Sequence, residues 1–93
     1  MNLYTKHDSE SVHGDGVIYI EFADEVPTRQ ASVFGNIWVR GDAEHWNKLT
    51  DRYYSEFEFE ASEHITSERF ERIWAEALSR EQSSRGPTAV EEP

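Results

Sequence analysis

An apolar stripe that begins at residue 70 constrains this chain more than any other feature. Its side chains recur at the i, i+3, i+4, i+7 and i+8 spacing of one helix face. The stripe consists of Phe70, Ile73, Trp74, Ala77 and Leu78. Thr66 is a suitable N-cap, and Ile65 before it forms a hydrophobic staple with Phe70. The pattern predicts an amphipathic helix from Thr66 to near Ser83, which must pack its apolar face against another layer.

Three short segments upstream of the stripe have the composition of strands. Residues 17–22 (VIYIEF) are dense in β-branched and aromatic residues, which favours a central strand covered on both faces. Residues 28–34 alternate well enough for a second strand, and residues 37–40 form a third. Gly35-Asn36 between them is a two-residue hairpin signal. Short connections of this kind predict an antiparallel meander.

Residues 55–60 (SEFEFE) alternate strictly between acidic and aromatic side chains. A period of two is typical of a half-buried strand, here at a sheet edge. Glu56, Glu58 and Glu60 would then form a line of carboxylates about 6.6–6.8 Å apart. Such a row suits the lysines and arginines of a partner. The alternative is that charges on an edge strand only prevent aggregation between sheets.

These elements predict an α+β fold in which a small antiparallel sheet of three to four strands packs against one C-terminal amphipathic helix. The single domain would cover residues 17–82. Residues 1–16 would form a flexible N-terminus, and residues 83–93 a disordered acidic tail, because neither end has an apolar period. Between the third and fourth strands, Asp42 could cap a short helical turn.

The net charge of −10 is concentrated in the second half of the chain, where residues 51–93 carry eleven acids and five arginines. An acidic surface is repelled by nucleic-acid phosphates and by anionic membranes, so we expect neither as a partner. A basic protein, for example a toxin or a nuclease, is the expected partner. The absence of cysteine and of a signal-like apolar segment in Met1–Gly16 favours a cytoplasmic location.

No motif for catalysis, metal binding or cofactor binding is found. The four histidines lack zinc-ligand spacing, and no serine or glycine-rich loop has the context of an active site. Asp42, Glu44 and His45 could in principle group around a metal, but a loop of ordinary polar residues explains them far better. We therefore predict no catalytic residue, metal or cofactor, and no enzymatic activity.

Two tryptophans are candidates for an aromatic contact with a partner. If Ile37 and Val39 face the helix, Trp38 points away from it with Phe34 and forms an exposed patch. Trp46 lies in the irregular segment and could serve the same purpose, whereas Trp74 belongs to the helix stripe. The predicted partner-binding residues are Glu56, Glu58, Glu60, Trp38 and Trp46.

Two motifs resemble those of a group of small acidic bacterial proteins of unknown function, some of which look like immunity proteins that neutralise toxins. The first is Arg29-Gln30-Ala31-Ser32-Val33-Phe34, and the second runs from Ile65-Thr66 through Phe70 to Ile73-Trp74. The resemblance covers about residues 17–78, while the aspartate-rich loop of that group is reduced here to Gly41–Asp51. It implies an immunity-type binding function but assigns no functional residue.

The expected function is that of a non-enzymatic binding protein, an acidic immunity or antitoxin-type inhibitor of a basic protein. Two alternatives stay open at this point. The chain could form a homodimer or larger homo-oligomer through the edge at residues 53–60 or through the Trp38 face. It could also be a small enzyme or metal-binding protein that uses His45 and the neighbouring acids.

Overall fold

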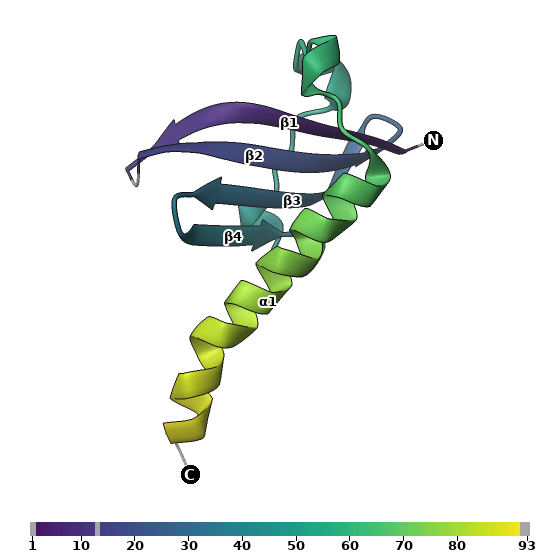
Figure 1. Cartoon of the computed structure of the whole chain (residues 1–93). Coiled ribbons are helices and arrows are strands. Elements are labelled where there is room, and N and C mark those ends of the chain that lie inside the picture. The colour runs from purple at the N-terminus through teal and green to yellow at the C-terminus, as the bar shows by residue number, and fades with distance from the viewer. Residues whose placement is uncertain (1, 13, 92–93) are drawn as a thin grey trace.

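The computed structural model describes the backbone of residues 2–12 and 14–91 and the side chains of residues 2–10, 12 and 14–80 (Figure 1). Its core is an antiparallel sheet of four strands in the order β1-β2-β3-β4. The strands are β1 (Asn2–Ser11), β2 (Gly14–Ala23), β3 (Val26–Phe34) and β4 (Ile37–Gly41). Three single 3-10 turns follow, at η1 (Trp46–Lys48), η2 (Tyr54–Glu56) and η3 (Ala61–Glu63), before the helix α1 (Ser67–Glu91). The predicted α+β class, the meander and the C-terminal helix are confirmed.

The first strand is the main departure from the sequence prediction. Residues 2–11 were expected to be flexible, but they pair with β2 over its whole length, from Asn2 opposite Ala23 to Ser11 opposite Gly14. Thr5 is completely buried, and Tyr4 packs on Phe70 of α1 with ring centroids 5.3 Å apart. The prediction was wrong because it relied on apolar content, whereas this strand is held by backbone pairing, by the buried Thr5 and by the half-buried Tyr4.

The segment at residues 55–60 is not a strand. Phe57 and Phe59 do lie on one side, with their rings stacked 4.9 Å apart, as their alternation suggested. The backbone at Phe57 and Glu60 is also extended, with φ/ψ of −91°/159° and −85°/163°. It pairs with no strand of the described sheet, because alternation shows which side is buried and does not supply a hydrogen-bonding neighbour.

The helix begins as predicted. Thr66 Oγ1 accepts the backbone N–H of Arg69 at 3.1 Å, and Ile65 and Phe70 both pack in the core. Salt bridges at i,i+4 spacing join Glu68 to Arg72 and Glu76 to Arg80. The helix continues to Glu91, beyond the expected end near Ser83, and its last turns project away from the sheet (Figure 1). Of the predicted disordered tail, residues 92–93 lie outside the described residues.

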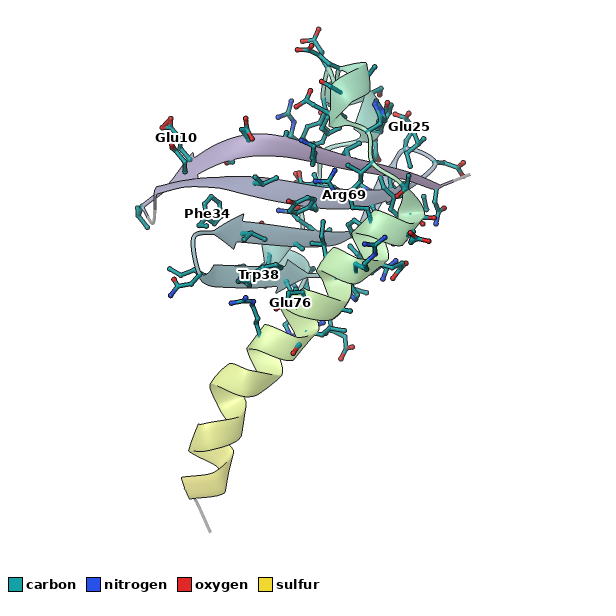
Figure 2. All side chains as sticks on the ribbon, viewed as in Figure 1. Glu10, Glu25, Phe34, Trp38, Arg69 and Glu76 are labelled. Carbon is teal, nitrogen blue, oxygen red and sulfur yellow. The ribbon has the colours of Figure 1, made fainter. Side chains whose placement is uncertain are left out.

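The helix covers one face of the sheet, and Trp38 lies on that face. Ala31, Phe70, Trp74 and Ala77 form the buried core there, and Trp38 packs against them (Figure 2). The prediction that Trp38 shares an exposed patch with Phe34 is therefore wrong. The β3–β4 register places Val33 and Trp38 opposite each other on the helix side, so Phe34 lies on the other face, where it is buried.

Candidate functional site

Residues 42–64, here called the outer layer, cover the face of the sheet opposite α1. The outer layer starts at the end of β4 and crosses to the free edge of β1. Backbone and side-chain hydrogen bonds attach it to the sheet at several points. The N–H of Thr50 donates to Gln30 Oε1 at 2.8 Å, and the N–H of Tyr54 donates to the carbonyl of Glu25 at 2.9 Å. A single β-bridge joins His64 to Thr5. The irregular segment is thus held at both margins of the sheet.

The inner side of the outer layer is aromatic. Phe22, which is fully buried, meets the rings of Tyr54, Phe57 and Phe59 edge-on at centroid distances of 5.4–6.0 Å. Such aromatic pairs stabilise by about 0.5–1.5 kcal/mol beyond the burial of their area. This second core fixes the outer layer without any regular secondary structure longer than one turn.

Two histidines lie at the border of this aromatic cluster. Nε2 of His64 is 2.6 Å from the hydroxyl of Tyr54, and its Nδ1 is 3.1 Å from the carbonyl of Glu60. His7 lies beside Phe57 and Phe59, and its buried Nδ1 has no hydrogen-bond partner among the described residues. Burial lowers the pKa of His7, although the carboxylates of Glu63 and Asp8 oppose this shift. This position therefore favours the neutral form of His7.

The outer side of the same layer is acidic. Between residues 42 and 64 the chain has seven carboxylates against Lys48 and Arg52, a net charge of −5 out of −10 for the whole chain. The carboxylates are Asp42, Glu44, Asp51, Glu56, Glu58, Glu60 and Glu63. Two large aromatic side chains of this layer are also exposed: Trp46 is 74% exposed and Tyr53 is 55% exposed. Half of the net charge thus lies on one irregular layer that also exposes aromatic side chains.

Of the predicted partner-binding residues, four lie on this surface. Glu56, Glu58, Glu60 and Trp46 are all exposed, but the three glutamates do not form a row on a strand. Glu56 has a local structural contact, because its carboxylate accepts the N–H of Tyr53 at 2.8 Å. Glu60 also has a local structural contact, because its carboxylate forms a capping box with the backbone of Glu63. The side chain of Glu58 makes no hydrogen bond or ion pair within the described part of the chain, which leaves it available to a partner. The position of Trp38 in the helix-side core favours a packing role.

The loop after β4 uses the carboxylate of Asp42 to organise itself. Asp42 accepts a hydrogen bond from Arg40 and from the backbone N–H groups of Glu44 and His45. It also lies 3.1 Å from Nδ1 of His45. The three residues considered as metal ligands are thus joined by hydrogen bonds that shape a turn. Among the described residues, no group of three histidine or acidic side chains is arranged to hold a metal ion.

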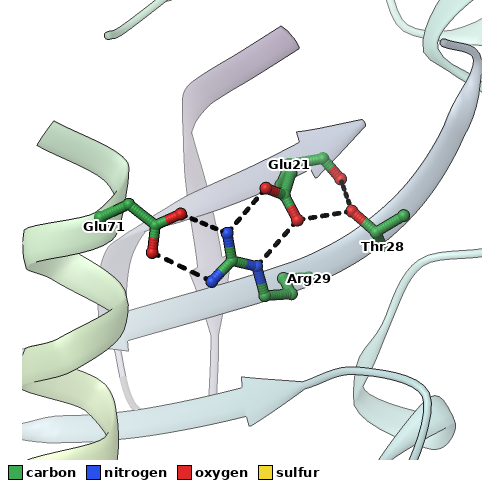
Figure 3. Close-up of polar contacts among 4 residues, drawn as sticks. All are labelled: Glu21, Thr28, Arg29 and Glu71. Carbon is green, nitrogen blue, oxygen red and sulfur yellow. Dashed lines mark hydrogen bonds and ion pairs between the residues drawn. The ribbon is translucent and has the colours of Figure 1, made fainter. Parts of the chain in front are cut away.

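Sequence reasoning missed a partly buried charge network that joins the sheet to the helix (Figure 3). Arg29 donates from Nε and Nη2 to the two carboxylate oxygens of Glu21 at 2.8 and 2.7 Å. It also donates from Nη1 and Nη2 to Glu71 of α1 at 3.1 and 2.5 Å. Its guanidinium lies 5.1 Å from the ring of Phe70 and 5.2 Å from that of Trp74. We call Arg29, Glu21 and Glu71 the arginine network.

The sequence did contain a signal for this network. Glu21 is the one charged residue within the otherwise apolar segment 17–22, and Arg29 lies in the next predicted strand. A buried charge needs a partner of opposite sign. In the sheet Glu21 and Arg29 are direct cross-strand neighbours. The hydrogen bonds from Arg29, assisted by Thr28, hold the pKa of Glu21 below its usual range against the opposing effect of burial.

This shift predicts a loss of stability in acid. The folded pKa of Glu21 lies below its unfolded value of about 4.3, so its contribution is present above that value and is lost as the pH falls through the folded pKa. Urea unfolding from pH 6 to pH 2 should show a steeper decline for the wild type than for Glu21→Gln. His7, with a lowered pKa, contributes a separate decline that begins near pH 6.5. Equal slopes below pH 4.5 in the two proteins would contradict the prediction.

Comparison with protein-family models, with curated proteins and with solved structures found no match. Within the described residues, no helix combines the length and the apolar character needed to cross a membrane.

Proposed function

We propose that this protein is a non-enzymatic binding protein of the immunity or antitoxin type, and that its outer layer occupies a basic surface of a partner protein. The observation that carries the proposal is the coincidence of five exposed carboxylates with exposed Trp46 and Tyr53 on one layer. Large aromatic side chains often dominate the binding energy of protein interfaces. The surrounding carboxylates would supply charge complementarity and speed the encounter.

The architecture supports a recognition role for this layer. Its inner face is fixed by the cluster around Phe22, so the exposed side chains stand on a preorganised support. Preorganisation lowers the entropy cost of binding. A toxin or nuclease that binds nucleic-acid phosphates has a basic surface of the required sign. Residues 17–78 resemble small acidic bacterial proteins of unknown function, some of which look like immunity proteins, and this resemblance agrees with such a partner.

The test begins with capture of the partner from the source cell, followed by measurement of its binding to purified variants. Trp46→Ala should weaken binding by about 2 kcal/mol or more, roughly 30-fold. Because Trp46 is mostly exposed, the same change should alter the free energy of unfolding by no more than about 0.5 kcal/mol. Glu58→Gln with Glu60→Gln should slow association and reduce its dependence on salt.

The matched control is Glu68→Gln with Glu76→Gln, which removes the same charge from α1 and leaves the outer layer intact. It should bind with nearly wild-type affinity at physiological salt. The proposal would be contradicted if the helix double variant weakened binding as much as the outer-layer double variant. It would equally be contradicted if Trp46→Ala bound like the wild type.

A further inference from the structure

The outer edge of β1 is only partly used by the fold. Along this edge, the bridge between Thr5 and His64 and the hydrogen bond from Ile65 N–H to the Tyr4 carbonyl (2.9 Å) are the contacts with the rest of the chain. Because the backbone groups of successive strand residues alternate in direction, Asp8 and Glu10 point theirs outward like Tyr4. Within the described residues, these N–H and C=O groups have no backbone partner.

The free part of this edge carries negative charge on the helix side of the sheet. The side chains of Asp8 and Glu10 share that side with Tyr4, and Glu10 lies opposite Asp15 of β2. Together with Ser9 they line a hollow of about 470 Å³. The helix crosses the other end of the strand, so Glu10 projects where α1 does not reach (Figure 2). In the described part of the chain, free backbone groups and carboxylates without an ion-pair partner therefore occur together.

An added strand could pair with both the free backbone groups and the carboxylates of this edge. Its backbone would take up the free N–H and C=O groups of Asp8 and Glu10, as in other cases of strand addition. Residues on one face of a strand repeat every 6.6–6.8 Å or so, which matches the spacing of Asp8 and Glu10 on β1. Lysine or arginine at every second position of the added strand would therefore lie beside both carboxylates. Opposite charges on facing strands stabilise the pairing, and like charges oppose it.

We propose that the edge of β1 at residues 8–10 binds an extended segment of a partner protein that carries lysine or arginine at alternate positions, as a fifth strand. A second copy of this chain fits less well, because each copy carries a net charge of −10 and the two repel each other. The site lies on a different margin from Trp46 and does not depend on the function proposed for the outer layer.

The test is an NMR titration of the ¹⁵N-labelled full chain with a short synthetic peptide that alternates lysine with threonine. We expect shifts centred on residues 6–10 and slower hydrogen exchange of the Asp8 and Glu10 amides. The control peptide, in which glutamate replaces lysine, should cause neither effect. Asp8→Asn with Glu10→Gln keeps the backbone donors and should weaken peptide binding about three- to tenfold, as expected for lost charge pairing across strands.

Asp8→Pro removes an outward N–H without removing a bond to β2, so it should fold and abolish the exchange protection. Peptide-induced shifts confined to residues 42–64, or equal binding of the two peptides, would overturn the proposal. Sedimentation of the wild type measures self-association, and a monomer would exclude a second copy as the occupant. A dimer that Asp8→Pro dissociates would assign the edge to self-association and overturn the basic segment as its occupant.

Discussion

Replacing Arg29 with alanine is expected to lower the free energy of unfolding by about 3–5 kcal/mol, because removal of one partner leaves a buried charge uncompensated. The carboxylate of Glu21 has a side chain that is only 9% exposed, and it would lose two hydrogen bonds. The change also removes the cation stacked near Phe70 and Trp74 and the link to α1 through Glu71. In a domain of this size, each kcal/mol lowers the melting temperature by about 4–8 °C.

Three variants separate charge from packing in this prediction. Arg29→Lys keeps the charge but loses the forked geometry that reaches two carboxylates, so it should fall between the wild type and Arg29→Ala. Glu21→Gln combined with Arg29→Met should recover part of the loss, because the pair is then neutral and still fills its volume. Arg72→Ala, which breaks an exposed pair with Glu68, should change stability by only about 0.5 kcal/mol or less.

The measurement is urea unfolding of the wild type and the four variants at pH 7, monitored by circular dichroism. A loss below about 1 kcal/mol for Arg29→Ala would be typical of an ordinary surface ion pair. It would contradict the expectation that the arginine network stabilises the packing of the helix on the sheet. The comparison with Arg72→Ala is informative because both changes delete one arginine. They differ in the burial of the carboxylate left behind.

The sequence predicted those elements whose side chains separate clearly into buried and exposed sets. The stripe from Phe70 to Leu78 can face only one way in a helix, and it does pack on the sheet. β1 shows no such separation, since Lys6 and Asp8 alternate with the equally polar His7 and Ser9. Its position depends on backbone pairing with β2 along ten residues, and side-chain patterns do not encode a pairing partner.

For the candidate site, the sequence predicted which side chains are exposed but not how they are arranged. The exposure of Trp46, Glu58 and Glu60 follows from polar surroundings in the sequence. Their arrangement does not, because the outer layer takes its path from contacts with Gln30, Glu25 and Thr5, which are distant in the chain. Trp38 was assigned to the wrong face because a short apolar strand has no alternation that decides which side faces the helix.

Phe22→Ala should have the second large effect, a loss of about 3–5 kcal/mol for a buried phenylalanine. Phe22 is fully buried and is shared by the rings of Tyr54, Phe57 and Phe59. No strand of the sheet pairs with residues 54–60, so these ring contacts are the main attachment of that part of the outer layer. We therefore expect the outer layer to loosen before the sheet and helix unfold.

Hydrogen exchange at the amides of residues 54–64 measures this loosening. In Phe22→Ala these amides should exchange faster at urea concentrations where β2 and β3 stay protected. Phe22→Leu keeps most of the volume and should cost less than about 1.5 kcal/mol. Phe70→Ala is the matched control, because it removes a buried ring of the same size from the helix side. Equal acceleration of the outer-layer amides by both alanine variants would show one cooperative core. Selective acceleration by Phe22→Ala would show that the acidic surface rests on a core of its own.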